Sequence, residues 1–123
     1  MNKKTILVVD DDPDILDALQ FTLEDAGYLV KTTEKTDYAE HLHDSGGQLP
    51  DIIILDVLLS GKDGRTICKL LKSHIETKAI PVIMISAHPD AEKSVKDVGA
   101  DDFIAKPFDI DHLLKIVKGC LGK

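Results

Sequence analysis

Asp56 is the residue of this sequence whose surroundings most clearly favour a chemical role. It follows an unbroken aliphatic run, Ile52 to Leu55, and residues 60–64, which include two glycines, come shortly after it. Four to eight aliphatic residues bounded by turn signals are typical of a strand buried on both faces. Open α/β sheets bind their ligands at the carboxyl ends of such strands, and Asp56 is expected at one of those ends.

A second acidic cluster follows another aliphatic run. Asp10, Asp11 and Asp12 come directly after residues 6–9, Ile-Leu-Val-Val. If the two strands are neighbours, several carboxylates converge on one edge of the sheet, where they repel one another unless a cation lies among them. The pattern therefore predicts a divalent-metal site, with a carboxylate available to form an acyl phosphate.

A hydroxyl and an ammonium group are expected at the same edge. Ser86 follows the apolar run 81–85, and Lys106 follows the short run 103–105. Both groups can hydrogen-bond to the oxygens of an incoming phosphoryl group, and the ammonium group can also neutralise their charge. Acidic oxygens are the ligands that Mg²⁺ prefers in proteins. Together these residues predict Mg²⁺-dependent phosphoryl chemistry.

The elements that must position these residues alternate along the chain. Strands are expected at residues 5–9, 29–32, 51–55, 81–85 and 103–105. Helices are expected from an N-cap at Asp12 to a C′ glycine at Gly27, around 37–43, over a segment with Ile67, Leu70, Leu71 and Ile75, from Pro89 to about Val98, and from about Ile110 to Cys120. Alternating strands and helices predict a parallel sheet covered on both faces.

Composition limits the class of protein. A chain of 123 residues with 43% hydrophobic content supports one domain, expected over residues 1–123. A net charge of -7 and a single arginine, Arg65, argue against a nucleic-acid-binding surface. No secretory or long apolar segment is found, so no membrane association and a cytoplasmic location are expected. Cys68 and Cys120 match no metal or redox spacing and are expected to be buried, inert thiols.

The chain resembles the receiver domain of two-component response regulators. The stretches that carry the resemblance are residues 6–11, Asp56 with Asp63-Gly64, residues 85–87, and Lys106-Pro107-Phe108. They cover essentially the whole chain, and their combination in this order is highly specific. The resemblance implies a flavodoxin-like three-layer α/β/α sandwich whose five parallel strands have the order 2-1-3-4-5.

The resemblance also implies a role for each site residue. Asp56 would accept a phosphoryl group from a histidine kinase or a histidine phosphotransfer protein, and Ser86 and Lys106 would bind that group. Ser86 and Phe103 would change position on activation. Phe103 could equally be a core aromatic. The implied Mg²⁺ ligands are Asp10, Asp11, Asp56 and the backbone carbonyl of Leu58.

The same resemblance implies a switch. Phosphorylation would repack the face formed by helix four, strand five and helix five, which would then act on a downstream protein or output domain. A phosphorylation-dependent homodimer is a further expectation. The module would be a phosphoacceptor that assists its own reaction, rather than an enzyme that acts on a diffusible substrate.

Two departures from the family pattern and two alternatives remain open. Leu59-Ser60 stands where the family often has Met-Pro, so the loop 58–63 is expected to be less restrained. Leu58 cannot orient a water molecule, although His88 could do so from the other side, and this leaves the phosphoryl lifetime open.

One alternative is a Mg²⁺-dependent phosphatase with Asp10 or Asp12 as nucleophile. The other is a receiver that serves only as a docking platform. The Lys106-Pro107 peptide bond could be cis or trans.

Overall fold

A five-stranded parallel sheet forms the centre of the molecule. The computed structural model describes residues 3–44, 48–59, 61–88 and 90–122. The strands are β1 (Thr5–Val9), β2 (Leu29–Thr33), β3 (Ile52–Asp56), β6 (Val82–Ser86) and β7 (Asp102–Ala105). They pair in the order β2-β1-β3-β6-β7, and every pairing is parallel. The predicted order 2-1-3-4-5 is therefore confirmed.

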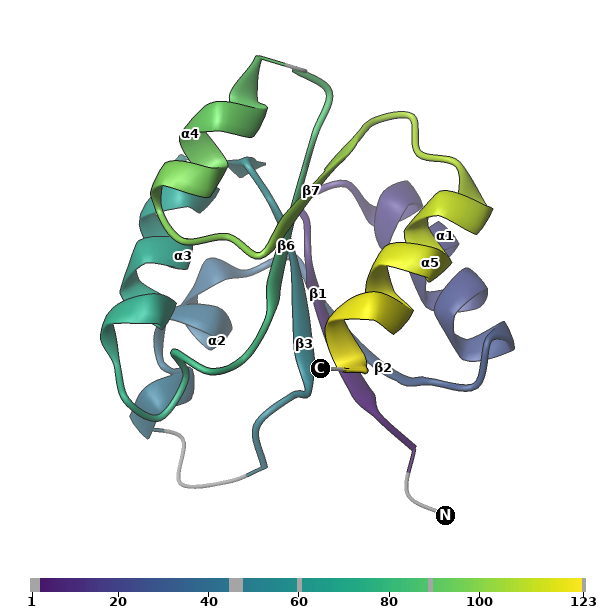
Figure 1. Cartoon of the computed structure of the whole chain (residues 1–123), viewed down its shortest axis with the longest axis horizontal. Coiled ribbons are helices and arrows are strands. Elements are labelled where there is room, and N and C mark those ends of the chain that lie inside the picture. The colour runs from purple at the N-terminus through teal and green to yellow at the C-terminus, as the bar shows by residue number, and fades with distance from the viewer. Residues whose placement is uncertain (1–2, 45–47, 60, 89, 123) are drawn as a thin grey trace.

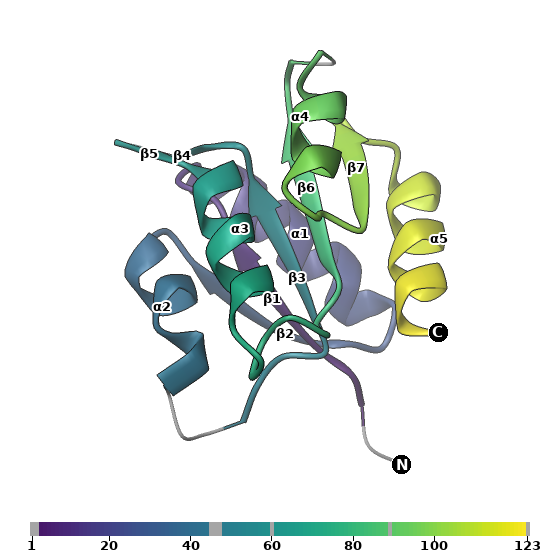
Figure 2. The ribbon, with the colours of Figure 1, turned by 60° about the vertical axis from the view of Figure 1, so that its left-hand side comes forward.

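Helices cover both faces of this sheet. On one face lie α1 (Pro13–Asp25) and α5 (Ile110–Leu121), and on the other lie α2 (Thr36–Glu40), α3 (Gly64–Ser73) and α4 (Ala91–Asp97) (Figures 1 and 2). A 3-10 helix, η1 (Leu42–Asp44), follows α2. The predicted three-layer α/β/α sandwich is confirmed. No helix among the described residues has the length and apolar character needed to cross a membrane.

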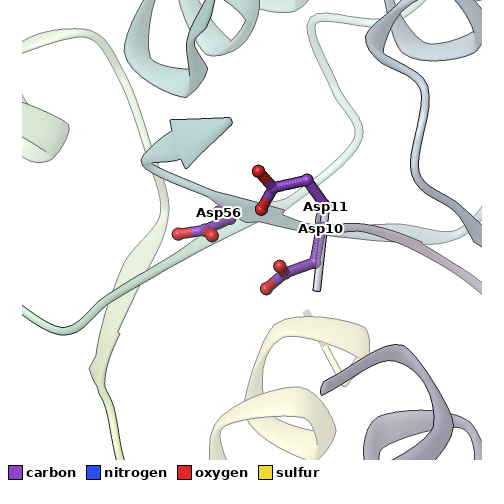
Figure 3. Close-up of side chains that lie close together, drawn as sticks. All are labelled: Asp10, Asp11 and Asp56. Atoms are coloured by element: carbon purple, nitrogen blue, oxygen red, sulfur yellow. The ribbon is translucent and has the colours of Figure 1, made fainter. Parts of the chain in front are cut away.

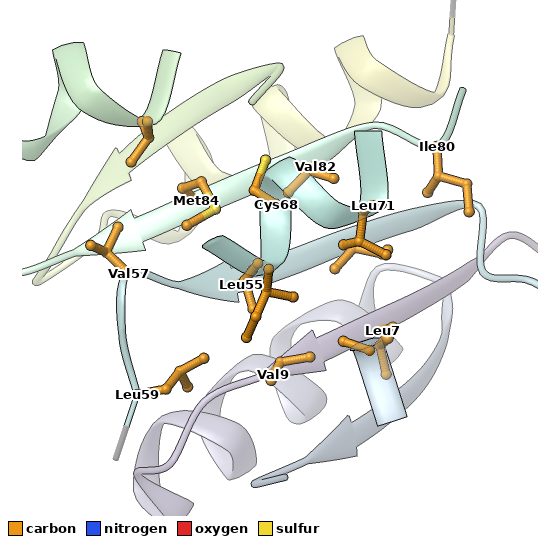
Figure 4. Close-up of a cluster of buried hydrophobic side chains, with 14 of the residues drawn as sticks. Leu7, Val9, Leu55, Val57, Leu59, Cys68, Leu71, Ile80, Val82 and Met84 are labelled. Carbon is orange, nitrogen blue, oxygen red and sulfur yellow. The ribbon is translucent and has the colours of Figure 1, made fainter. Parts of the chain in front are cut away.

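Two hydrophobic clusters pack against the two faces. All five residues of β3 and all five of β6 are buried, which explains their nearly continuous aliphatic sequence. Figure 4 shows the cluster on the α2, α3 and α4 side, where side chains of β1, β3 and β6 meet those of α3.

This cluster includes the buried thiol of Cys68, and burial raises the pKa of that thiol to about 11. Cys120 is buried on the other face. Both cysteines are therefore placed as predicted, and the thiolate of Cys68 is disfavoured.

Capping residues set the ends of α1. The side chain of Asp12 accepts a hydrogen bond from the backbone N–H of Asp14 at 3.0 Å, and Pro13 occupies the first turn. The helix ends before Gly27, whose φ of 101° lies in the left-handed region that favours glycine. The sequence predicted both ends from these residues, and both are confirmed.

The C-terminal end of α3 differs from the prediction. The helix ends at Ser73, His74 is extended, and Ile75 is 78% exposed instead of lying on the buried helix face. The hydroxyl of Thr77 is fully buried and donates to the carbonyl of Leu71 at 2.6 Å. A turn fixed by this buried hydrogen bond replaces the last helical turn, so the prediction that this helix includes Ile75 was wrong. For α4, which begins at Ala91, the predicted start at Pro89 lies outside the described residues.

A short antiparallel hairpin follows β3. It consists of β4 (Leu58–Leu59) and β5 (Lys62–Asp63), and Gly61 between them has a φ of 74°. The ammonium group of Lys62 forms ion pairs with Glu40 and Asp37 of α2. Strand pairing and contacts with α2 thus connect the described residues of this segment to the rest of the fold. The expectation that the segment is less restrained without the proline stays a prediction. Ser60 lies outside the described residues.

Candidate functional site

Three carboxylates converge where β1 and β3 end. In the register of these strands Val9 lies opposite Leu55, so Asp10, which follows β1, lies beside Asp56. One carboxylate oxygen from each of Asp10, Asp11 and Asp56 lies within 4.8 Å of the other two (Figure 3). Asp10 is completely buried and Asp56 is 5% exposed. The structure thus brings together the three acids that the sequence singled out, and their hard oxygen donors fit Mg²⁺.

Lys106 contacts two of the three carboxylates. Its Nζ lies 3.1 Å from Oδ2 of Asp10 and 3.2 Å from Oδ2 of Asp56. The residue follows β7, and the Lys106-Pro107 peptide bond is cis, which resolves the alternative that the sequence left open. One ammonium group therefore faces two buried carboxylates and a third close to them, so these four side chains carry an excess of negative charge.

This excess is reflected in the pKa values. Burial raises the pKa of Asp56 above the ordinary 3.8, and the charge of Asp10 raises it further, while Lys106 acts in the opposite direction. For Lys106 the largest single effect is burial, which lowers the pKa. Hydrogen bonding and charge attraction from Asp10 and Asp56 together outweigh it and leave the pKa raised. Lys106 is therefore a cation at neutral pH.

Backbone N–H groups orient the two buried carboxylates. Oδ1 of Asp10 accepts a hydrogen bond from the N–H of Asp12 at 2.9 Å, and Oδ1 of Asp56 accepts one from the N–H of Leu58 at 3.3 Å. In each carboxylate, one oxygen thus accepts a hydrogen bond from the backbone and the other accepts one from Lys106. The side chain of Leu58 is 53% exposed, and the ligand role of its carbonyl stays a prediction.

Gly64 is a site residue whose role the sequence analysis missed. A Cβ atom at this position would lie 2.0 Å from the carbonyl oxygen of Asp56, and the Gly64 N–H donates to the carbonyl of Val57 at 2.7 Å. The start of α3 is therefore packed directly against the end of β3, and only glycine fits there. The Asp63-Gly64 pair was noted as a motif, but this contact depends on a fold that the local sequence does not encode.

Ser86 and Phe103 lie on the strands beyond β3. Ser86 ends β6, which pairs with β3. The residue is buried, and its Oγ accepts a hydrogen bond from the N–H of His88 at 3.0 Å. It lines an open pocket of about 320 Å³, and Leu58 and Arg65 line the same pocket. Phe103 is buried in the cluster on the α3 and α4 side. Its core position is therefore established, while its role as a switch stays a prediction.

Comparisons with known proteins agree on one family. Residues 6–118 match the family model described as the response regulator receiver domain. The chain is 39% identical over 121 residues to the DNA-binding dual master transcriptional regulator RpaA of Synechocystis, and the match covers 96% of this chain and 49% of RpaA. The chain spans about half the length of the first curated relatives that it matches.

Solved structures share the fold. A putative response regulator from Chloroflexus aurantiacus superimposes with a TM-score of 0.91 at 35% identity, over 99% of this chain and 100% of that one. The receiver domain of the sensor histidine kinase PA1611 from Pseudomonas aeruginosa superimposes with a TM-score of 0.87 at 23% identity, over 99% of this chain and 100% of that one. That structure has a magnesium ion coordinated in its active site cleft.

Proposed function

The chain belongs to the response regulator receiver domain family of two-component signalling, and from this premise we propose that Asp56 is the residue that accepts the phosphoryl group in a Mg²⁺-dependent reaction. The observation that carries the proposal is the convergence of three carboxylates and Lys106 at the end of β3. Asp56 combines the two properties that an acceptor needs, since it lies within this cluster and retains slight exposure.

The proposed reaction moves a phosphoryl group from one nucleophile to another. An oxygen of Asp56 forms a bond to phosphorus while the bond between phosphorus and the donor nitrogen of a phosphohistidine breaks, and the product is an acyl phosphate. Lys106 neutralises charge on the transferred group, and the hydroxyl of Ser86 donates a hydrogen bond to it. Asp10, Asp11, Asp56 and the Leu58 carbonyl would hold Mg²⁺, which supplies charge neutralisation at the phosphoryl oxygens when bound.

The buried state of Asp10 favours Asp56 over Asp10 as the acceptor. Asp10 is completely buried, whereas Asp56 retains slight exposure, and this difference separates two carboxylates that are engaged alike by Lys106 and a backbone N–H. Asp12, the other candidate in the phosphatase alternative, serves as the N-cap of α1. A phosphoacceptor at Asp56 that assists its own reaction therefore accounts for the site better than an enzyme that acts on a diffusible substrate.

The partners follow from the chemistry of the family. We infer that a histidine kinase or a histidine phosphotransfer protein donates the phosphoryl group to residues 1–123, which act as one receiver domain. The face built by α4, β7 and α5 would then change and act on an output segment, a separate protein or a second copy of the chain. Phe103 lies in β7, and Ser86 ends the neighbouring strand β6. A transcriptional output is proposed by likeness to RpaA, whose name describes a DNA-binding regulator.

Intact-protein mass spectrometry tests the proposal. After incubation with acetyl phosphate and Mg²⁺, the protein should carry one added phosphoryl group, and the same protein with EDTA should carry none. The Asp56→Asn variant should stay unmodified, while Asp17→Asn, which removes an exposed carboxylate of α1, should be modified like the parent. Modification of Asp56→Asn, or no modification of the parent, would exclude Asp56 as the acceptor.

A further inference from the structure

Arg65, the single arginine of the sequence, lies in the first turn of α3 and connects the β4–β5 hairpin to α4. Its Nε and Nη2 donate to the carboxylate of Asp63 at 2.9 and 2.7 Å, and its Nη1 donates to Oγ of Ser94 in α4 at 3.0 Å. The planar guanidinium group thus spans from the end of β5 to the middle of α4. A two-pronged pairing of this kind fixes the orientation of the group, which lysine cannot reproduce.

The Ser94 hydroxyl is suited to receive this bond. It donates its own hydrogen to the carbonyl of Ala91 at 2.8 Å, so its lone pairs are oriented as an acceptor for Arg65. Within the described part of the chain, the other side-chain hydrogen bonds of α4, Lys93 to Asp97 and Lys96 to Glu92, stay inside the helix. Among the described residues, the bond from Arg65 therefore joins the middle of α4 to another element, while at the C-cap of the helix Cys68 Sγ of α3 donates a weak bond to the carbonyl of Val98 at 3.9 Å.

The helix α4 is otherwise lightly anchored. It has seven residues, of which Ala91 and Val95 are buried, and the side chain of its N-cap residue, Asp90, makes no capping hydrogen bond. A helix of this length is not stable by itself and depends on tertiary contacts. A single charge-assisted hydrogen bond is therefore a substantial part of what fixes its position.

The other end of the Arg65 contact reaches Asp56 in two short steps. Asp63 pairs with Leu58 in the hairpin, and the N–H of Leu58 donates to Oδ1 of Asp56. Gly64, between Asp63 and Arg65, lies directly against the carbonyl of Asp56. Hydrogen bonds from Arg65 also hold the pKa of Asp63 below its ordinary value, so the pair stays charged at neutral pH.

We propose that Arg65 is a positioning residue that ties α4 to the hairpin beside Asp56, so that a change at Asp56 shifts α4 through the Arg65–Ser94 hydrogen bond. The link to phosphorylation rests on the proposed function, whereas the tie itself exists in the unphosphorylated protein. Because coupling between two sites is reciprocal, loosening α4 should also change how readily Asp56 is modified. A rearrangement of the Leu58–Asp63 pair moves Asp63, and Arg65 transmits this movement to Ser94.

Amide hydrogen exchange of residues 91–97 tests the tie in the full, unphosphorylated chain. Arg65→Ala should accelerate exchange in α4 by about fivefold, the effect expected from losing a net hydrogen-bond contribution of ordinary size. Because Ser94→Ala also raises helix propensity, the decisive comparison is a double-mutant cycle. Arg65→Ala should accelerate exchange in the parent chain and have no effect in a chain that already carries Ser94→Ala. Equal acceleration in both chains, or none in either, would overturn the proposal.

The same measurement after treatment with acetyl phosphate and Mg²⁺ tests the coupling. The change in α4 exchange on phosphorylation should fall severalfold in Arg65→Ala and in Arg65→Lys. Lys96→Ala, which breaks an ion pair within α4, should keep the full change. A full change in Arg65→Ala would refute the coupling. If the parent chain takes up no phosphoryl group, the proposed function fails, and the cycle in the unphosphorylated protein alone decides on the tie.

Discussion

Replacing Asp56 by asparagine should stabilise the metal-free protein. The nearest oxygens of Asp10, Asp11 and Asp56 lie within 4.8 Å of one another. At an effective dielectric constant of about 20, each carboxylate pair at that distance repels by about 3.5 kcal/mol. At the 3.2 Å between Lys106 Nζ and Asp56 Oδ2, the attraction is about 5 kcal/mol on the same scale. Asp56 therefore experiences more repulsion than attraction.

The expected gain is about 1 to 2 kcal/mol in the free energy of unfolding, because two repulsions exceed one attraction and solvent near the partly exposed Asp11 screens one of them. The asparagine oxygen can still accept the Leu58 N–H, so this hydrogen bond is kept. The raised pKa of Asp56 also indicates that its negative charge destabilises the folded protein. Below pH 3.8 the carboxyl group is protonated in both the folded and the unfolded state, and stability falls as the pH rises through the higher pKa of the folded state. The variant should lack this component of the pH dependence.

Urea denaturation at neutral pH, with and without Mg²⁺, measures both effects. Without metal, Asp56→Asn should unfold at a higher urea concentration than the parent, while Mg²⁺ should stabilise the parent much more than the variant. Asp17→Asn, which makes the same change in net charge at an exposed position of α1, serves as the control. A variant less stable than the parent without metal, or equally stabilised by Mg²⁺, would refute the electrostatic reasoning.

Three further predictions concern the same site. Gly64→Ala should lower the free energy of unfolding, measured by urea denaturation, by about 2 to 3 kcal/mol, because its Cβ would lie 2.0 Å from the Asp56 carbonyl oxygen. The control Gly119→Ala, in open space on α5, should raise it by about 0.5 to 1 kcal/mol. Equal effects of the two substitutions would contradict the packing argument. The affinity for Mg²⁺, measured by calorimetry, should fall as the pH drops through the raised pKa of Asp56, because Asp56 then takes up a proton. This fall should begin at a higher pH than an ordinary carboxyl group of pKa 3.8 would give. An affinity that does not depend on pH would contradict this prediction. Leu58→Asn should shorten the phosphoryl lifetime because an amide can orient an attacking water, and an unchanged decay rate would remove that role.

Most of the fold could be predicted because its signals are local. The aliphatic runs of β1, β3 and β6 and the Asp12-Pro13 start of α1 depend on neighbouring residues only. The strand order had no such local signal, and its prediction came from the family resemblance rather than from periodicity. Given that order, the meeting of Asp10, Asp11 and Asp56 followed from the alignment of adjacent parallel strands.

What the sequence did not predict depends on contacts between distant segments. Ile75 fits the helical spacing of α3, but the buried Thr77 hydroxyl ends the helix earlier. The β4–β5 hairpin depends partly on Lys62 reaching Glu40 of α2, 22 positions away in the sequence. The bond from Arg65 to Ser94 spans 29 positions and has no local signature. Such contacts become visible only once the helices have been placed on the sheet.

The central claim is that Asp56 itself carries the phosphoryl group. Borohydride reduces an acyl phosphate of aspartate to homoserine, so reduction after treatment with acetyl phosphate and Mg²⁺, followed by peptide mass spectrometry, identifies the modified residue. We expect homoserine at position 56 and none in the sample that lacks Mg²⁺. Homoserine at position 10 or 12 instead, or unmodified aspartate at all three positions, would contradict the account.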